Sequence, residues 1–68
     1  MNHPVYGHGQ AALIYIGDTA ALAGAPTEPI GVVRSIHSDG CVTVTHGSDT
    51  SWRMHDSKTL TLLKRGEP

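Results

Sequence analysis

An Asp-Gly pair at Asp39 and Gly40 is the sequence feature that most restricts how this chain folds. The pair is a strong hairpin signal because glycine accepts the positive φ that closes a tight turn. A three-residue loop over 38–40 pairs Ile36 with Val42, whereas a two-residue loop would set an apolar strand face against a polar one. We therefore predict the three-residue loop, with Gly40 in the left-handed conformation.

This register predicts a single buried face for the two strands of the hairpin. Its inward residues are Val32, Ile36, Val42 and Val44. Arg34 has the same parity as these residues. Either a β-bulge displaces Arg34, or its aliphatic stem lies along the rim of the fold with the guanidinium in water.

A third strand is predicted after the hairpin, beyond a turn over residues 47–50 that is rich in Gly, Ser and Asp. Trp52 and Met54 share one parity of this strand and are predicted to be buried or half-buried. Arg53 and His55 share the opposite parity, because successive side chains of a strand point to opposite faces.

Residues 56–58 resemble a single turn of tight helix, which Asp56 or Ser57 is able to cap. A last short strand is predicted at 59–63, where leucine and threonine alternate. Three strands, a helical turn and a closing strand therefore make up the main part of the chain.

Residues 11–16 are the first strand candidate before the hairpin. Leu13 and Tyr15 share one face of it, and Ile14 and Ile16 share the other. Two apolar faces are typical of a strand that is buried on both sides, or of one whose outward face is covered by another subunit.

Gly17 and Asp18 then predict a turn, and residues 19–22 continue as a strand. Alanine and leucine in 19–24 also permit a helix, but so short a segment makes a poor isolated helix. Residues 23–29 hold two prolines, which prevent a regular ladder, so we predict a surface loop there.

Both ends of the chain are predicted to be tails, which leaves residues 11–64 as one domain. Residues 1–10 lack apolar periodicity and are predicted to be flexible, and 65–68 are predicted to be solvated. His3 and His8 have no third ligand nearby and no fixed geometry, so we assign no metal site to them.

The composition limits the classes of function. A chain of 68 residues has a marginal core, so oligomerisation is expected, and a net charge of −1 weakens the case for nucleic acid as the default partner. The single cysteine, Cys41, excludes an internal disulfide and suits a reducing compartment. No targeting segment is visible and residues 11–16 are too short to span a bilayer, so we expect a cytoplasmic protein without membrane association.

The order of turns and strands resembles that of SH3-like barrels. The resemblance covers residues 16–63 and rests on Gly-Asp, Ile-Gly-Val-Val-Arg-Ser-Ile, Asp-Gly, Val-Thr-Val and the closing Lys-Thr-Leu-Thr-Leu-Leu. It implies an all-β fold, a small SH3-like barrel of about five short antiparallel strands with one 3-10 turn, and it leaves function open.

A narrower resemblance is to the plasmid-borne type II dihydrofolate reductases, small SH3-like chains that assemble around one active pore. It covers Gly-Asp at 17–18, residues 31–33 and residues 51–63. The family's Val-Gln-Ile-Tyr run falls on Trp-Arg-Met-His at 52–55, and its lysine falls within 21–23, where none is present. The resemblance therefore implies shared architecture without the reductase chemistry.

The leading functional hypothesis is a non-catalytic binding or assembly module. It would self-associate or bind a protein partner through Trp52, Met54, Leu13 and Tyr15. The reason is that an apolar strand in so short a chain lacks enough of its own surface to cover it.

Two alternatives stay open. A barrel that binds single-stranded nucleic acid would use Arg34, Arg53, His55 and Lys58, with Trp52 as a stacking platform. Arg53 and Trp52 point to opposite faces of a regular strand, so they would share one surface only through a bulge. An enzyme with a shared pore would instead bring His55 or Arg53 of several chains together.

Catalytic residues, metals and cofactors are not assigned. His46, His55 and Asp56 form the only titratable cluster of interest, and metal binding by the two histidines would need a further ligand. Neither Ser51 nor Ser57 lies in a recognisable nucleophile motif.

Overall fold

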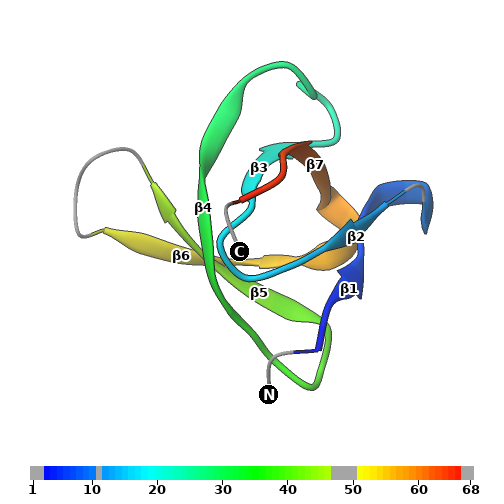
Figure 1. The fold of residues 1–68 in the computed structure, drawn as a ribbon, viewed down its shortest axis with the longest axis vertical. Helices are drawn as coiled ribbons and strands as arrows, with labels where there is room; N and C mark the ends of the chain where they lie inside the picture. The colour runs from blue at the N-terminus through cyan, green and yellow to red at the C-terminus, as the bar shows by residue number, and fades with distance from the viewer. Residues whose placement is uncertain (1–2, 11, 47–50, 67–68) are drawn as a thin grey trace.

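The structure is a computed structural model, and it describes residues 3–10, 12–46 and 51–66 (Figure 1). The described elements are β1 (Val5–Tyr6), the 3-10 turn η1 (His8–Gln10), β2 (Leu13–Ile14), β3 (Thr19–Leu22), β4 (Pro29–Ile36), β5 (Cys41–His46), β6 (Trp52–Asp56), the 3-10 turn η2 (Ser57–Thr59) and β7 (Leu60–Lys64). The predicted all-β class is confirmed. Within the described ranges, no helix is both long and apolar enough to cross a membrane.

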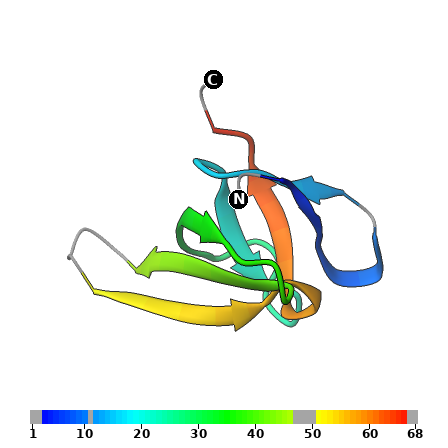
Figure 2. The ribbon, with the colours of Figure 1, turned by 90° about the horizontal axis from the view of Figure 1, so that it is seen from below.

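Five of the strands form one antiparallel sheet in the order β6-β5-β4-β3-β7, and β1 pairs with β2 in a separate two-stranded sheet. Figure 2 shows the β5–β6 ribbon extending to one side of β3 and β7, with β1 and β2 on the other side. In the part of the chain that is described, β6 and β7 remain the two edges of the larger sheet. The sheet is therefore not closed, and the predicted barrel is not shown.

The β4–β5 hairpin has the predicted register. Ile36 is paired with Val42, and Gly40 has a φ of 92°, which is the left-handed conformation. The His37 amide donates to the Cys41 carbonyl at 2.9 Å. A two-residue loop would have reversed the apolar faces, so burial of the valines selects this turn.

A β-bulge at Arg34 interrupts β4. Val33 pairs with Val44 and Ser35 pairs with Thr43, so Arg34 has no counterpart on β5 and is exposed. The predicted inward position of Val32 is therefore wrong. Because the bulge shifts the alternation by one residue, Val33 takes the buried place.

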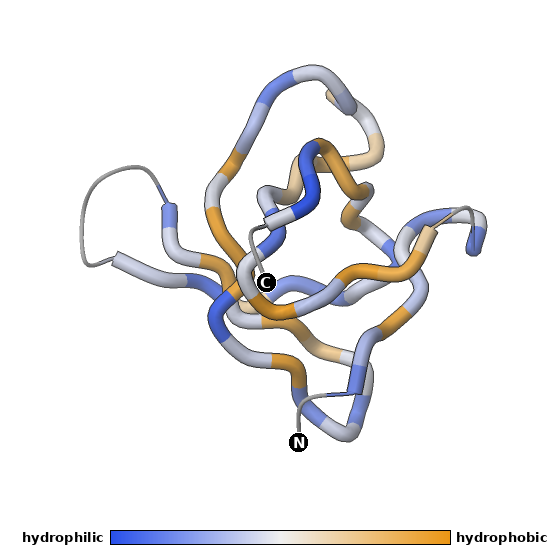
Figure 3. Tube along the Cα trace, in the orientation of Figure 1, coloured by the Kyte–Doolittle hydropathy of each residue, from blue (hydrophilic) through white to orange (hydrophobic). Residues whose placement is uncertain are grey.

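The core is small and aliphatic. Its fully or nearly fully buried apolar residues are Ile14, Ala20, Ala21, Val33, Ile36, Val42, Val44 and Leu60. In Figure 3 the apolar segments, drawn in orange, recur along several of the strands that surround this core. Gly31 lies against the backbone of β5, because a Cβ there would overlap the carbonyl oxygen of Thr45. Glycine at this position lets β4 and β5 approach closely.

The N-terminal residues differ from the predicted flexible tail. Val5 pairs with Ile14 and Tyr6 pairs with Leu13, so β1 covers one side of the core. The strand predicted over 11–16 is correspondingly limited to the two residues of β2. Two-residue strands carry too little periodicity to be recognised from sequence.

The segment that precedes β4 follows the prediction. The Asp18 amide donates to the Tyr15 carbonyl at 3.1 Å and closes the Gly-Asp turn, and residues 19–22 form β3 rather than a helix. Residues 23–28 form the loop that leads to β4.

The tight helical turn before the last strand is η2. Asp56 caps it by accepting a hydrogen bond from the Lys58 amide at 3.0 Å, and the Thr59 hydroxyl donates to the Asp56 carbonyl at 2.7 Å. Of the two predicted caps, Asp56 is the one used, and Ser57 is buried.

Candidate functional site

The outer surface of β4, β5 and β6 carries an open group of side chains around the only tryptophan. We call it the Trp52 face; its members are Arg34, Ser35, His37, Thr43, Thr45, Trp52 and Met54, which line a shallow hollow of about 400 Å³. The second predicted turn, 47–50, lies outside the described residues. The face joins three neighbouring strands.

Trp52 and Met54 lie opposite Thr45 and Thr43 of β5, and they are 62% and 51% exposed. The prediction that they are buried or half-buried is therefore wrong for the single chain. In the register with β5, Arg53 and His55 take the positions opposite Val44 and Val42, on the face of the sheet that holds the core. The outer face is left for the tryptophan and the methionine.

The bulge in β4 places Arg34 on the same surface as Trp52. Its Nε donates to Oγ1 of Thr45 at 3.0 Å, so the side chain lies along the sheet instead of extending into solvent. His37 and Thr43 are joined in a similar way, with His37 Nε2 2.8 Å from the Thr43 hydroxyl oxygen. Of the predicted nucleic-acid contacts, Arg34 is therefore the one that shares a surface with Trp52.

The opposite side of the β5–β6 ribbon holds a histidine pair, His46 and His55. Their Nε2 atoms are 3.1 Å apart, which is hydrogen-bond distance for two neutral imidazoles of complementary tautomers. The ring centroids are 5.3 Å apart, much further than the nitrogens, so the rings meet through their Nε2 edges. Asp56, the third member of the predicted cluster, caps η2 instead.

The surroundings of His55 disfavour its protonated form. Partial burial, followed by repulsion from His46 and Arg53, lowers the pKa of His55 below its usual value of 6.5. Arg53 itself is exposed, on the strand face that it shares with His55. His55 therefore holds its neutral form to lower pH than an unperturbed histidine does.

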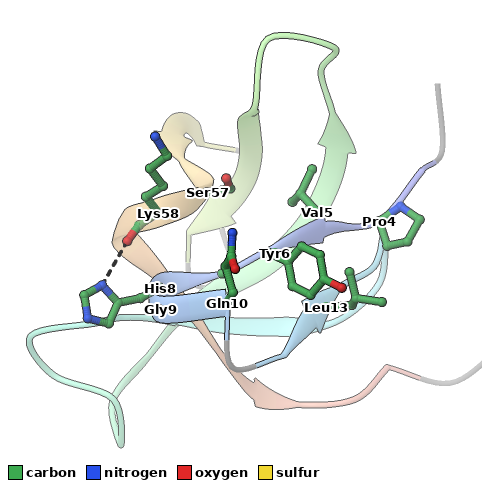
Figure 4. Close-up of a pocket in the computed structure, with 10 residues that line it drawn as sticks. Pro4, Val5, Tyr6, His8, Gly9, Gln10, Leu13, Ser57 and Lys58 are labelled. Atoms are coloured by element: carbon green, nitrogen blue, oxygen red, sulfur yellow. Dashed lines mark hydrogen bonds between the residues drawn. The ribbon is translucent and has the colours of Figure 1, made fainter.

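A third feature is the N-terminal hollow, which lies between β1, η1 and η2 (Figure 4). Tyr6, Leu13 and Lys58 contribute to its lining, and His8 Nδ1 donates to the Lys58 carbonyl at 3.2 Å. Leu13 and Lys58, two of the predicted contact residues, therefore line this hollow and not the Trp52 face. Tyr15 is separate again, with the Arg65 guanidinium 4.7 Å above its ring.

None of the three features carries an activated nucleophile. Partial burial and the Asp39 carboxylate raise the pKa of the Cys41 thiol, so the less reactive neutral form dominates at neutral pH. Ser57 is buried, whereas Ser51 is exposed before β6. Among the residues that are described, no group of three or more His, Cys, Asp or Glu side chains is placed to hold a metal ion.

Comparison with known proteins gives no relative for this chain. No protein-family model, no curated protein and no solved structure matches it. Function is therefore inferred from the geometry of the Trp52 face and of the histidine pair.

Proposed function

We propose that this chain is a non-catalytic binding module that self-associates through the Trp52 face. The observation that carries the proposal is the exposure of Trp52 and Met54, 62% and 51%, side by side on the outer face of an edge strand. Exposed tryptophan and methionine are typical of the centres of protein interfaces, where they supply much of the binding energy.

The distribution of aromatic residues supports the same conclusion. The chain holds one tryptophan, two tyrosines and no phenylalanine, and all three rings lie outside the aliphatic core. Aromatic side chains bury the largest apolar area of any residue type. A small domain that places them on its surface stands to gain burial from a second copy.

The polar side chains around Trp52 and Met54 are suited to form the border of an interface. Arg34 Nε and the hydroxyls of Thr45 and Thr43 already have hydrogen-bond partners, so burial would not leave these atoms unpaired. The terminal N–H groups of Arg34 would keep their water at the border of the interface. A second copy related by a two-fold axis would present the same apolar centre and the same polar border.

The proposal extends to the architecture. The five antiparallel strands of the larger sheet and the 3-10 turn before the last strand support this, since the resemblance to SH3-like barrels implies about five such strands and one 3-10 turn. The pairing of β1 with β2 and the turn η1 are additional to that pattern. We therefore propose an SH3-like topology in which the open outer face of the β4–β6 region is the assembly surface.

Sedimentation equilibrium over the micromolar range tests self-association. We expect the wild-type mass to rise towards that of a dimer, and the double variant Trp52→Ser/Met54→Ser to stay monomeric. Tyr6→Ser is the matched control, because Tyr6 is 54% exposed but lies in the N-terminal hollow, and it should associate like the wild type. A wild-type chain that stays monomeric throughout, or a control that dissociates as the double variant does, would contradict the proposal.

One observation favours a second candidate function, the binding of single-stranded nucleic acid. The bulge gives the Trp52 face a guanidinium next to an exposed aromatic ring, the combination used for backbone contact and base stacking. Fluorescence anisotropy with labelled oligonucleotides would then show binding that weakens with salt and is lost in Arg34→Gln and Trp52→Ser. Absence of binding at low salt would remove this candidate and leave self-association intact.

A further inference from the structure

We propose that His46 and His55 form a two-imidazole binding site for a divalent first-row transition metal ion. The site lies on the side of the β5–β6 ribbon opposite the Trp52 face, so it is separate from the proposed assembly surface. Its ligands are the two Nε2 atoms, and water completes the coordination.

The separation of the two nitrogens fits chelation. They are 3.1 Å apart. With metal–nitrogen bonds of about 2.0–2.1 Å, this separation corresponds to an angle of about 100° at the metal, between the square-planar and tetrahedral values. The two residues lie on adjacent strands and on one face of the ribbon, but the cross-strand partner of His55 is Val42, four positions before His46. The two side chains therefore reach towards each other along the face to bring their nitrogens together.

Binding replaces the hydrogen bond between the rings. In the metal-free chain one Nε2 carries a proton that the other accepts. On binding, that proton is exchanged through solvent to Nδ1 of the same ring, so both rings stay neutral and both Nε2 lone pairs turn to the ion. Because the rings meet end to end, each has to tilt by about 40° for this geometry. Both side chains are only partly buried, and the second torsion angle of histidine is soft enough to allow such a tilt.

The donor set defines the class of ion. Neutral imidazole suits zinc, copper and nickel, and affinity for such a site follows the general order in which copper binds most tightly. Arg53 opposes any cation, because its charge already acts on His55. Removal of this charge should therefore strengthen metal binding, whereas removal of either imidazole should weaken it.

Isothermal titration of the full chain with zinc sulfate tests the site, at a protein concentration below that of self-association or in the Trp52→Ser/Met54→Ser background. We expect His46→Gln and His55→Gln each to weaken zinc binding by about tenfold or more, because a lost ligand costs at least as much as a lost outer-shell partner. Arg53→Gln should tighten it severalfold. The triple variant His3→Gln/His8→Gln/His37→Gln removes every other histidine of the chain and should bind as the wild type does.

Nitrogen-15 spectra of the imidazoles provide a second readout. Zinc should shift Nε2 of His46 and His55 together in the wild type and in the triple variant. Three outcomes would each overturn the proposal. They are loss of zinc binding in the triple variant, unchanged zinc binding in His46→Gln and His55→Gln, and the absence of any Nε2 shift.

Discussion

The Asp18 carboxylate accepts a hydrogen bond from the Arg65 guanidinium at 2.8 Å, across 47 positions of sequence. The same carboxylate accepts from the Tyr15 amide at 2.9 Å and from the Gly66 amide at 2.8 Å. Asp18 is almost completely buried, and its satisfied oxygens join the turn before β3 to the segment after β7. Arg65, predicted to lie in a solvated tail, is instead part of this network.

Asp18→Asn should destabilise the fold by about 2–3 kcal/mol, because a buried acceptor of three hydrogen bonds loses its charge and directs an amide N–H at a donor. Urea denaturation measures the change in the free energy of unfolding. Arg65→Gln is the control: its side chain is 49% exposed, so water replaces the lost contact and the cost should stay below about 1 kcal/mol. Equal stability of Asp18→Asn and the wild type would show that the network is dispensable.

Gly31→Ala should destabilise the fold by about 2 kcal/mol or more, because the new Cβ overlaps the Thr45 carbonyl and forces β4 and β5 apart. Gly24→Ala is the matched control. A Cβ at Gly24 meets nothing, so this variant should be neutral or more stable by up to about 1 kcal/mol through the unfolded state. Thermal unfolding followed by circular dichroism distinguishes the two variants. Similar melting temperatures would show that the close approach of β4 to β5 does not contribute to stability.

Stability should fall as the pH is lowered through the range below about 6.5. The pKa of His55 is lower in the folded chain, mainly through burial and then through His46 and Arg53, so the unfolded state takes up the proton first. The free energy of unfolding therefore rises with pH between the folded and the unfolded pKa of His55. The contribution of His55 is fully present above the unfolded pKa and is lost as the pH falls to the folded pKa.

Urea titrations at several pH values in EDTA measure this slope. His55→Gln should flatten it, and Met54→Gln, which introduces the same side chain on the other face of β6, should retain it. A slope that is unchanged in His55→Gln would assign the pH dependence to another group.

Trp52 reports its own environment, because it is the only tryptophan in the chain. If the Trp52 face forms the interface, emission should shift to shorter wavelength and iodide quenching should weaken as the protein concentration rises. Tyr6→Ser should behave in the same way. Emission and quenching that do not depend on concentration would place any self-association elsewhere on the surface.

The hairpin of β4 and β5 is predictable from sequence because its register is determined by residues that are close together in the chain. Asp39 and Gly40 define the turn, and the alternation of Val42 and Val44 selects the apolar face. The same local logic identifies η2 and its cap. The ordered β1 is not predictable in this way, since two residues pair with two others and the contact is entirely tertiary.

The two surface features are less accessible to sequence reasoning. Hydrophobicity alone assigns Trp52 and Met54 to the interior, but the register with β5 puts Arg53 and His55 on the core side. The contact of His46 with His55 is not a cross-strand pair, because the partner of His55 in that register is Val42, and it depends on how the two side chains extend along the face. The one local signal was the parity conflict at Arg34, which indicated a bulge without showing which valine would be buried.

That bulge also separates the requirements of folding from those of recognition. Without Arg34, residues 33, 35 and 36 would alternate regularly against Val44, Thr43 and Val42, so the loss of a single codon would keep every core pairing. The guanidinium beside Trp52 is therefore carried by a residue that no pairing between β4 and β5 requires.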